Sequence, residues 1–269
     1  MKTLQNHTLI YDNECPLCNL YSQGFIKAGM LGQNGREAFT ELSADHKNII
    51  DFHRAKNEIA LIDHTQKTVT YGLDSLLLII GNSFPFLEEI ARIKPLYWFF
   101  KKLYSFVSYN RKQIIPSAKD HSENACVPDF NLKYRLLFIA FVVVFSSLVL
   151  SVFSTKLGLG LNRNFSREFL ICSGQLVWQI LFLRSYLKEK LWDYLGNMMT
   201  VSLIGTLLLL PSLFLNIRST AAVVYFGIVV LIMLFEHLRR CRVLKLNLLP
   251  TVSWLIFRVL VVAALLSFN

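Results

Sequence analysis

Residues 11–18 read YDNECPLC, and this stretch decides how the first part of the chain folds. The apolar run at residues 8–12 is typical of a short buried strand, and the pattern over residues 16–30 is helical. Cys15 and Cys18 therefore lie three residues apart, where a strand passes into a helix. The segment predicts a pair of thiols on a strand–loop–helix unit.

The remainder of the first region continues this alternation of strands and helices. Short apolar or β-branched runs bounded by turn residues predict three more strands, the last two forming a hairpin. The resulting order βαβαββα is that of an α/β thioredoxin-like domain, with a parallel first half and an antiparallel second half. The predicted strands are 37–42, 58–63 and 69–71, and the predicted helices are 44–54, 73–80, 85–93 and 95–110.

The start of the first helix distinguishes the two thiols. Cys15 is expected at or just before that start, where unpaired backbone N–H groups and the helix dipole lower a thiol pKa from about 8.5 toward neutrality. Pro16 suits the first helical position because its missing N–H costs nothing there. Cys18 follows about one turn later, close enough for a disulfide. We predict Cys15 as the nucleophile and Cys18 as the resolving thiol, with Asp12 placed to influence proton transfer.

A zinc site is the alternative interpretation of a lone CxxC motif. Zinc takes four protein ligands, or three and a water, and the chain has no second CxxC and no HxxxH motif. The spacing favours redox chemistry, so we expect no metal. The histidines that could contribute ligands are more typical of solvated or strand-edge positions, namely His7, His46, His53 and His64.

Three segments of the first region resemble the DCC family of predicted thiol-disulfide oxidoreductases. The resemblance covers about residues 5–112 and implies a thioredoxin-like domain with Asp12, Cys15 and Cys18 as signature residues. The segments that carry it are YDxxCPLC at 11–18, YGxDSxL at 71–77 and YNR at 109–111.

Two features set limits on this resemblance. Family members often have glycine where this chain has Asn13, although asparagine also tolerates a left-handed backbone. No proline lies between Pro16 and Pro85, so the cis-proline that faces the thiols of thioredoxins has no counterpart here, a gap shared with the family. Substrate docking therefore cannot be inferred from thioredoxin.

Composition divides the 269-residue chain into two regions. A hydrophobic fraction of 54% and a mean hydropathy of +0.43 exceed what one soluble domain carries. Residues 1–112 hold 13 Lys/Arg and 11 Asp/Glu, residues 113–134 hold 2 and 3, and residues 135–269 hold 13 and 4. The net charge of +10 thus belongs to the apolar half. We predict domains at 1–112 and 135–269 with a linker at 113–134.

The charge and cysteine distributions exclude two classes of protein. No Lys/Arg run with interleaved aromatic residues lies in the first region, which argues against nucleic acid as a partner. The five cysteines are odd in number and dispersed, unlike the disulfide framework of a secreted protein. Residues 1–7, MKTLQNH, lack the apolar core of a signal peptide, so we expect the first domain to stay in the cytoplasm.

The predicted linker contains a third thiol, Cys126. Its surroundings are rich in Pro, Ser, Asn and Asp, which is typical of an irregular connection. A thiol there could exchange with Cys15 and Cys18, although an unpaired structural thiol is the simpler interpretation. We treat Cys126 as a secondary site residue.

The second region predicts about five membrane-spanning helices. Its apolar stretches each approach the roughly 20 residues needed to cross a hydrocarbon core. With a cytoplasmic first domain, nine flanking Lys/Arg lie inside and four outside, which favours a periplasmic C-terminus. We expect a multi-pass protein of a bacterial inner membrane. The stretches are 136–153, 169–187, 195–215, 220–235 and 248–268.

Four polar residues in or beside these spans are candidate functional residues. Gln175 and Gln179 share a helix face and could line a cavity or contact a quinone-like ligand, although interhelical hydrogen bonding is favoured. Arg258 lies near the middle of the last span, where a charge is costly unless it is paired or hydrated. Its candidate partners are Glu236, Glu168 and Asp193, and snorkelling to the lipid head groups is the alternative. Glu236 also ends the fourth span.

These observations predict a membrane-anchored thiol-disulfide oxidoreductase that needs no cofactor beyond its cysteine pair. A disulfide-bearing protein or a small thiol would be the substrate, and the lipid bilayer the surrounding partner. A quinone remains an unsupported addition. The alternative is a non-enzymatic docking or scaffold subunit of a membrane complex, with the aromatic residues of 97–109 facing a partner.

Overall fold

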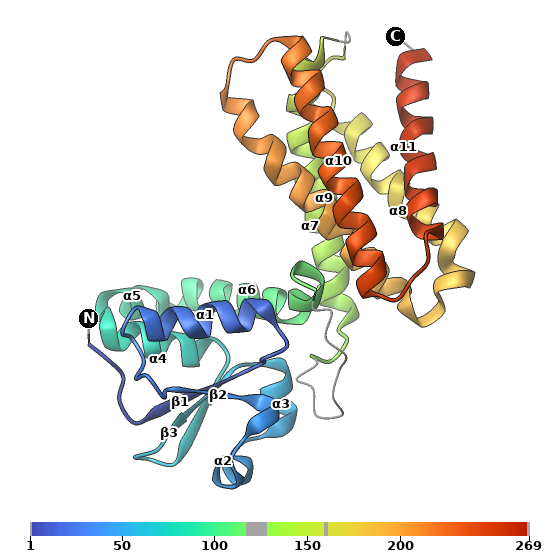
Figure 1. The fold of residues 1–269 in the computed structure, drawn as a ribbon. Coiled ribbons are helices and arrows are strands. Elements are labelled where there is room, and N and C mark those ends of the chain that lie inside the picture. The colour runs from blue at the N-terminus through green and yellow to red at the C-terminus, as the bar shows by residue number, and fades with distance from the viewer. Residues whose placement is uncertain (1, 117–127, 159–160, 268–269) are drawn as a thin grey trace. The chain divides into compact units, whose positions relative to one another are not determined.

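The computed structural model describes residues 2–116, 128–158 and 161–267, and the chain divides into two compact units, 1–134 and 135–269. The two units are coloured blue to green and green to red in Figure 1. The first is an α/β unit, and the described part of the second is helical.

The first unit is built on a mixed four-stranded sheet. Strand β1 pairs in parallel with β2 on one side and antiparallel with β3 on the other, and β3 pairs antiparallel with β4. The order β2-β1-β3-β4 confirms the predicted thioredoxin-like arrangement, with β1 in the interior of the sheet. The strands are β1 (His7–Tyr11), β2 (Arg36–Ala38), β3 (Ala60–Asp63) and β4 (Thr68–Tyr71).

Successive strand residues face opposite sides of this sheet, and each side has its own apolar cluster. Leu9 and Leu61 face α1 and α4 and pack with Leu31 and Ile79. Ile62 faces the other side and packs against the segment that follows β2. The helices of this unit are α1 (Pro16–Lys27), α2 (Ala44–Ile49), α3 (Phe52–Asn57), α4 (Leu73–Ser83), α5 (Pro85–Ala91) and α6 (Lys94–Ile114).

Two predicted elements of the first unit are wrong in detail. The single helix expected over 44–54 is two short helices, because Ile50 is extended and the Asp51 carboxylate accepts a hydrogen bond from the Arg54 N–H to begin α3. The strand expected over 37–42 ends at Ala38, and a turn of 3₁₀ helix, η1 (Phe39–Glu41), follows it. Both departures bring apolar side chains onto the sheet.

The second unit has four helical stretches, among the residues that the structure describes, that are long and apolar enough to cross a membrane. One of them, Phe165–Phe214, holds both α8 and α9, which meet at a 3₁₀ turn where Lys188 has a positive φ of 48°. The five expected spans are therefore approximately right. The helices are α7 (Leu132–Phe153), α8 (Phe165–Leu187), α9 (Leu191–Leu209), α10 (Ser219–Val243) and α11 (Leu249–Ser267).

Replacing Ile62 with alanine should destabilise the first unit by about 2–5 kcal/mol, because a fully buried side chain of β3 is lost and leaves a cavity. Urea-dependent proteolysis of the first unit within the full chain measures this change. Leu20→Ala is the control, since Leu20 is exposed on α1 and should change stability little. Equal effects of the two substitutions would contradict the packing described here.

Candidate thiol-disulfide site

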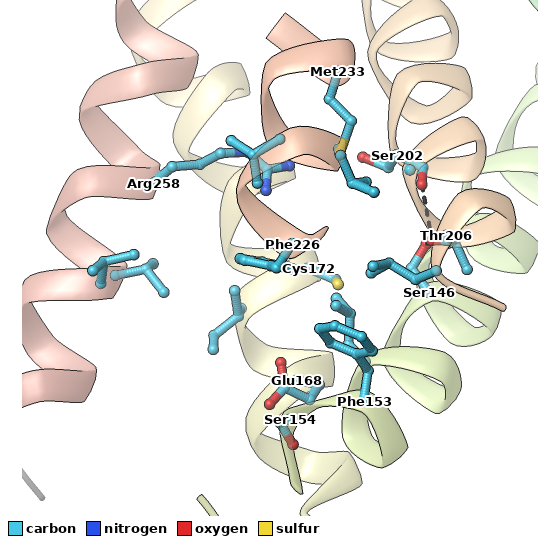
Figure 2. Close-up of a pocket in the computed structure, with 18 of the residues that line it drawn as sticks. Ser146, Phe153, Ser154, Glu168, Cys172, Ser202, Thr206, Phe226, Met233 and Arg258 are labelled. Carbon is cyan, nitrogen blue, oxygen red and sulfur yellow. Dashed lines mark hydrogen bonds between the residues drawn. The ribbon is translucent and has the colours of Figure 1, made fainter. Parts of the chain in front are cut away.

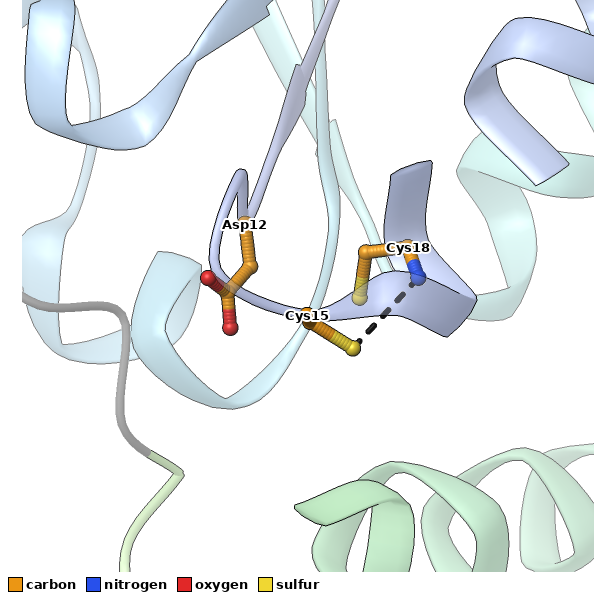
Figure 3. A group of neighbouring side chains, drawn as sticks. All are labelled: Asp12, Cys15 and Cys18. Carbon is orange, nitrogen blue, oxygen red and sulfur yellow. Dashed lines mark hydrogen bonds between the residues drawn. The ribbon is translucent and has the colours of Figure 1, made fainter. Parts of the chain in front are cut away.

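The two thiols lie where β1 gives way to α1. Cys15 is the N-cap residue of α1, in an extended conformation, and Pro16 is the first helical residue. The Cys18 backbone N–H donates to Cys15 Sγ at 3.4 Å, as the dashed line in Figure 3 shows. The Cys15 sulfur thus occupies the place where an N-cap side chain satisfies the open end of a helix.

Asp12 shapes the loop that leads to the helix. Its Oδ1 accepts a hydrogen bond from the Glu14 N–H at 3.0 Å, and its backbone carbonyl accepts one from the Cys15 N–H at 3.2 Å. The carboxylate and both sulfurs lie within 4.8 Å of one another. Asp12 is therefore close enough to both thiols to affect their charge.

Arg111, near the end of α6, is the residue that sequence reasoning did not place in the site. Its Nη2 donates to Asp12 Oδ2 at 3.2 Å and to the Lys56 carbonyl at 3.2 Å. Both partners of the ion pair are buried, and they are separated by 99 residues in the chain. The only signal for Arg111 in the sequence was its place in the YNR segment at 109–111.

The environment divides the two thiols into a thiolate and a thiol. A hydrogen bond from the Cys18 thiol, together with the charge of Arg111, lowers the pKa of Cys15 to about 7, against the opposing effects of burial and Asp12. Donating to Cys15, together with burial, raises the pKa of Cys18 far above its usual range. The negative charge of the pair therefore resides on Cys15.

Two buried tyrosines interact with Cys18. The Tyr21 hydroxyl hydrogen-bonds the Cys18 sulfur, and burial raises the pKa of Tyr21 well above its usual value. The Tyr104 hydroxyl accepts a hydrogen bond from the Ile59 N–H at 3.0 Å. Burial raises the pKa of Tyr104 as well, so both rings stay neutral beside the thiols. Nothing in the sequence pattern singled out Tyr21, and Tyr104 was only one of several aromatics in its helix.

The thiols are not open at the surface in this conformation. Cys15 and Cys18 are each 2% exposed, and Asp12 is 3% exposed. Reaction with the disulfide of a protein substrate therefore requires local opening of the site.

Asp12, Cys15 and Cys18 are also the one cluster, within the described ranges, whose atoms could hold a metal ion. Three donors fall short of the four that structural zinc sites have. The four histidines considered above contact other groups: His46 contacts Glu37, His64 contacts Thr8, and His7 and His53 pair with Asp63 and Asp129. The donor set fits a dithiol pair better than a zinc site.

A strand–loop–helix dithiol with one acidified cysteine, on a sheet of this order, defines a thioredoxin-like domain. Residues 9–116 match the family model for DCC1-like thiol-disulfide oxidoreductase, and Asp12, Cys15 and Cys18 fit the motif after which the family is named. This part of the chain is therefore similar to that family. Searches of curated proteins and of solved structures gave no match.

The two glutamines of α8 lie in different environments. Gln179 is fully buried, and its Oε1 accepts a hydrogen bond from the Tyr194 hydroxyl of α9 at 3.3 Å. Gln175 is also buried, but neither atom of its amide has a hydrogen-bond partner. Gln179 therefore makes a hydrogen bond between helices, as the favoured interpretation expected, whereas Gln175 makes none.

The two charged candidate residues of the second unit, Glu236 and Arg258, also have different partners. Glu236 accepts hydrogen bonds from Arg239 and Arg240, each at 2.7 Å. Arg258 instead stacks over the Trp254 ring at 4.2 Å, and its Nε is buried with no hydrogen-bond partner. Cys126, the secondary thiol, lies outside the described residues.

Replacing Cys18 with alanine should raise the pKa of Cys15 above about 7, because the main hydrogen-bond donor to the thiolate is removed. At pH 7 about half of Cys15 is thiolate in the native chain, and well below pH 7 this fraction falls about tenfold for each further pH unit. The measurement is the pH dependence of thiolate ultraviolet absorbance, with Cys15→Ser as the blank. Cys172→Ser, in the other unit, should leave the midpoint unchanged, and an unmoved midpoint in Cys18→Ala would refute this assignment.

Proposed function

We propose that this protein is a membrane-anchored thiol-disulfide oxidoreductase in which Cys15 is the nucleophile and Cys18 resolves the intermediate. The observation that carries the proposal is the opposite displacement of the two thiol pKa values across one helical turn. Thiol-disulfide exchange requires one thiolate and one thiol held in reserve, and this pair provides both.

The first step forms a mixed disulfide. The Cys15 thiolate attacks one sulfur of a substrate disulfide, a new S–S bond joins Cys15 to the substrate, and the other substrate sulfur leaves as a thiolate. The charge of Arg111 and the hydrogen bond from Cys18 stabilise the attacking thiolate.

The second step releases the substrate and oxidises the protein. Cys18 loses its proton and attacks Cys15 Sγ, a Cys15–Cys18 disulfide forms, and the remaining substrate sulfur leaves and is protonated. The substrate gains two electrons, which the cysteine pair loses. The Cys18 proton and one proton from solvent convert the two substrate thiolates to thiols. Asp12 is the acceptor best placed for the Cys18 proton, since its carboxylate lies within 4.8 Å of both sulfurs.

The apolar second unit supports a place in a membrane for this chemistry. The Lys/Arg distribution between its connections favours a cytoplasmic first unit and a C-terminus on the opposite side of the membrane. We place the protein in a bacterial inner membrane, where that side is the periplasm. A cytoplasmic pair rests mainly as a dithiol, which favours reduction of a disulfide-bearing protein or of a small disulfide over disulfide donation. The cysteine pair itself carries the electrons, so the reaction needs no bound cofactor.

A docking or scaffold role is the second candidate, and the surface of α6 favours it. Trp98 is 64% exposed and Phe99 is also exposed, while Phe86 of α5 is exposed as well. These side chains could cover a partner in a membrane complex without any redox step.

A Cys18→Ser variant separates the two candidates. In the full chain within membranes, this variant should accumulate reductant-sensitive covalent adducts at Cys15, because the mixed disulfide can form but cannot be resolved. Non-reducing electrophoresis followed by mass spectrometry identifies them. The control is Cys15→Ser/Cys18→Ser, which should form none. Absence of adducts in the single variant, together with normal cellular function of the double variant, would refute the enzymatic proposal and favour a docking role.

The orientation of the chain in the membrane can be tested separately by cysteine labelling. In a chain whose native cysteines are serine, Asn162→Cys should react with a membrane-impermeant maleimide in intact cells, because the connection before α8 would face the periplasm. Glu189→Cys, in the turn between α8 and α9, should react only after the membrane is opened. The reverse pattern would place the first unit outside the cytoplasm.

A further inference from the structure

A cavity of about 660 Å³ lies within the second unit, lined by residues of α7 to α11. This volume falls within the range of pockets that hold small molecules in proteins. Most of the lining is aliphatic or aromatic, including Leu150, Val230 and Val261. Figure 2 shows Arg258 reaching from α11 into the space between the helices, with Cys172 of α8 lining it.

Several polar groups of the lining are satisfied within the protein. The Thr206 hydroxyl donates to Ser146 Oγ at 2.8 Å and also lies 2.8 Å from the Ser202 carbonyl. Glu168 accepts hydrogen bonds from Arg167, including one of 2.6 Å, so its negative charge is neutralised. These groups have partners within the protein, so they give no indication of a ligand.

Gln175 and Arg258, by contrast, have buried polar atoms without hydrogen-bond partners. Both amide atoms of Gln175 are buried without a hydrogen-bond partner, although the side chain lines the cavity. Arg258 lines it too, and its Nε is buried and likewise lacks a partner. Buried polar atoms are nearly always hydrogen-bonded, so two unpartnered groups on residues that line one apolar space indicate a missing polar partner. The N–H groups of Arg258 and Gln175 need an acceptor from that partner.

No carboxylate in the described part of the second unit pairs with Arg258. Glu236 is bound by Arg239 and Arg240, and Asp193 pairs with Arg135. Glu168 is held by Arg167, and the fourth acidic residue, Glu189, lies in the turn between α8 and α9. The cavity therefore carries an uncompensated positive charge at the middle of α11, with apolar walls around it.

We propose that this cavity binds a membrane-soluble amphiphile whose head group presents acceptor oxygens to Arg258 and Gln175 while its apolar tail fills the remaining space. A guanidinium only donates hydrogen bonds, so the head group must accept them, as a carboxylate or a quinone carbonyl does. The positive charge favours the anionic carboxylate. A free fatty acid and an isoprenoid quinone are two sources of this chemistry.

Binding is tested on the delipidated full chain in detergent with two radiolabelled probes, oleate and a short-chain menaquinone. At least one probe should bind with a stoichiometry of one. Arg258→Gln and Gln175→Leu should each weaken that binding at least tenfold. Arg184→Gln is the matched control, because Arg184 is an exposed arginine of α8 that does not line the cavity. The probe that binds identifies the source of the head group.

A second measurement needs no variant. Cys172 lines the cavity, so the bound probe should slow its labelling by a maleimide, whereas the buried Cys241 lies outside the cavity and should show no such protection. Protection of Cys172 that disappears in Arg258→Gln supports the proposal. Failure of both probes to bind the native chain, or equal binding by the native chain and the two cavity variants, would overturn it.

Discussion

The buried ion pair between Asp12 and Arg111 joins the loop before α1 to the last turn of α6, across 99 residues of the chain. Removing one member of such a pair leaves the other as an uncompensated buried charge and costs about 3–5 kcal/mol, so each of the two residues requires the other. The same arginine lowers the pKa of Cys15 through its charge. One interaction thus fixes the position of the loop and tunes the chemistry at the helix start.

Local sequence patterns were enough to predict the sheet and the place of the two thiols. The apolar run at 8–12 and the CxxC at a strand–helix junction depend on neighbouring residues only, and the structure has both. The split between α2 and α3 was missed because an apolar periodicity over 44–54 concealed the cap formed by Asp51. Arg111 was missed for a different reason, since its role depends on packing between segments far apart in the sequence.

The two glutamines of α8, in the second unit, also show that sequence patterns do not predict contacts between distant segments. Their spacing placed them on one helix face, but their surroundings depend on which neighbour each one meets. Gln179 meets Tyr194 of α9, while Gln175 meets the cavity. A four-residue spacing predicts a shared direction from the helix axis, and it does not predict what lies in that direction.

Arg111 and Arg258 show how differently one residue type is used in the two units. Arg111 is buried with a carboxylate, so its charge is compensated by the protein itself. Arg258 stacks on Trp254, and a cation–π contact of this kind is worth about 2 kcal/mol or more when desolvated. An arginine at the centre of a membrane span costs about 2.5–3.5 kcal/mol even by the mildest scale. Because the stacking leaves the positive charge of Arg258 in place, a group that neutralises Arg258 from within the cavity would stabilise the second unit as well as bind to it.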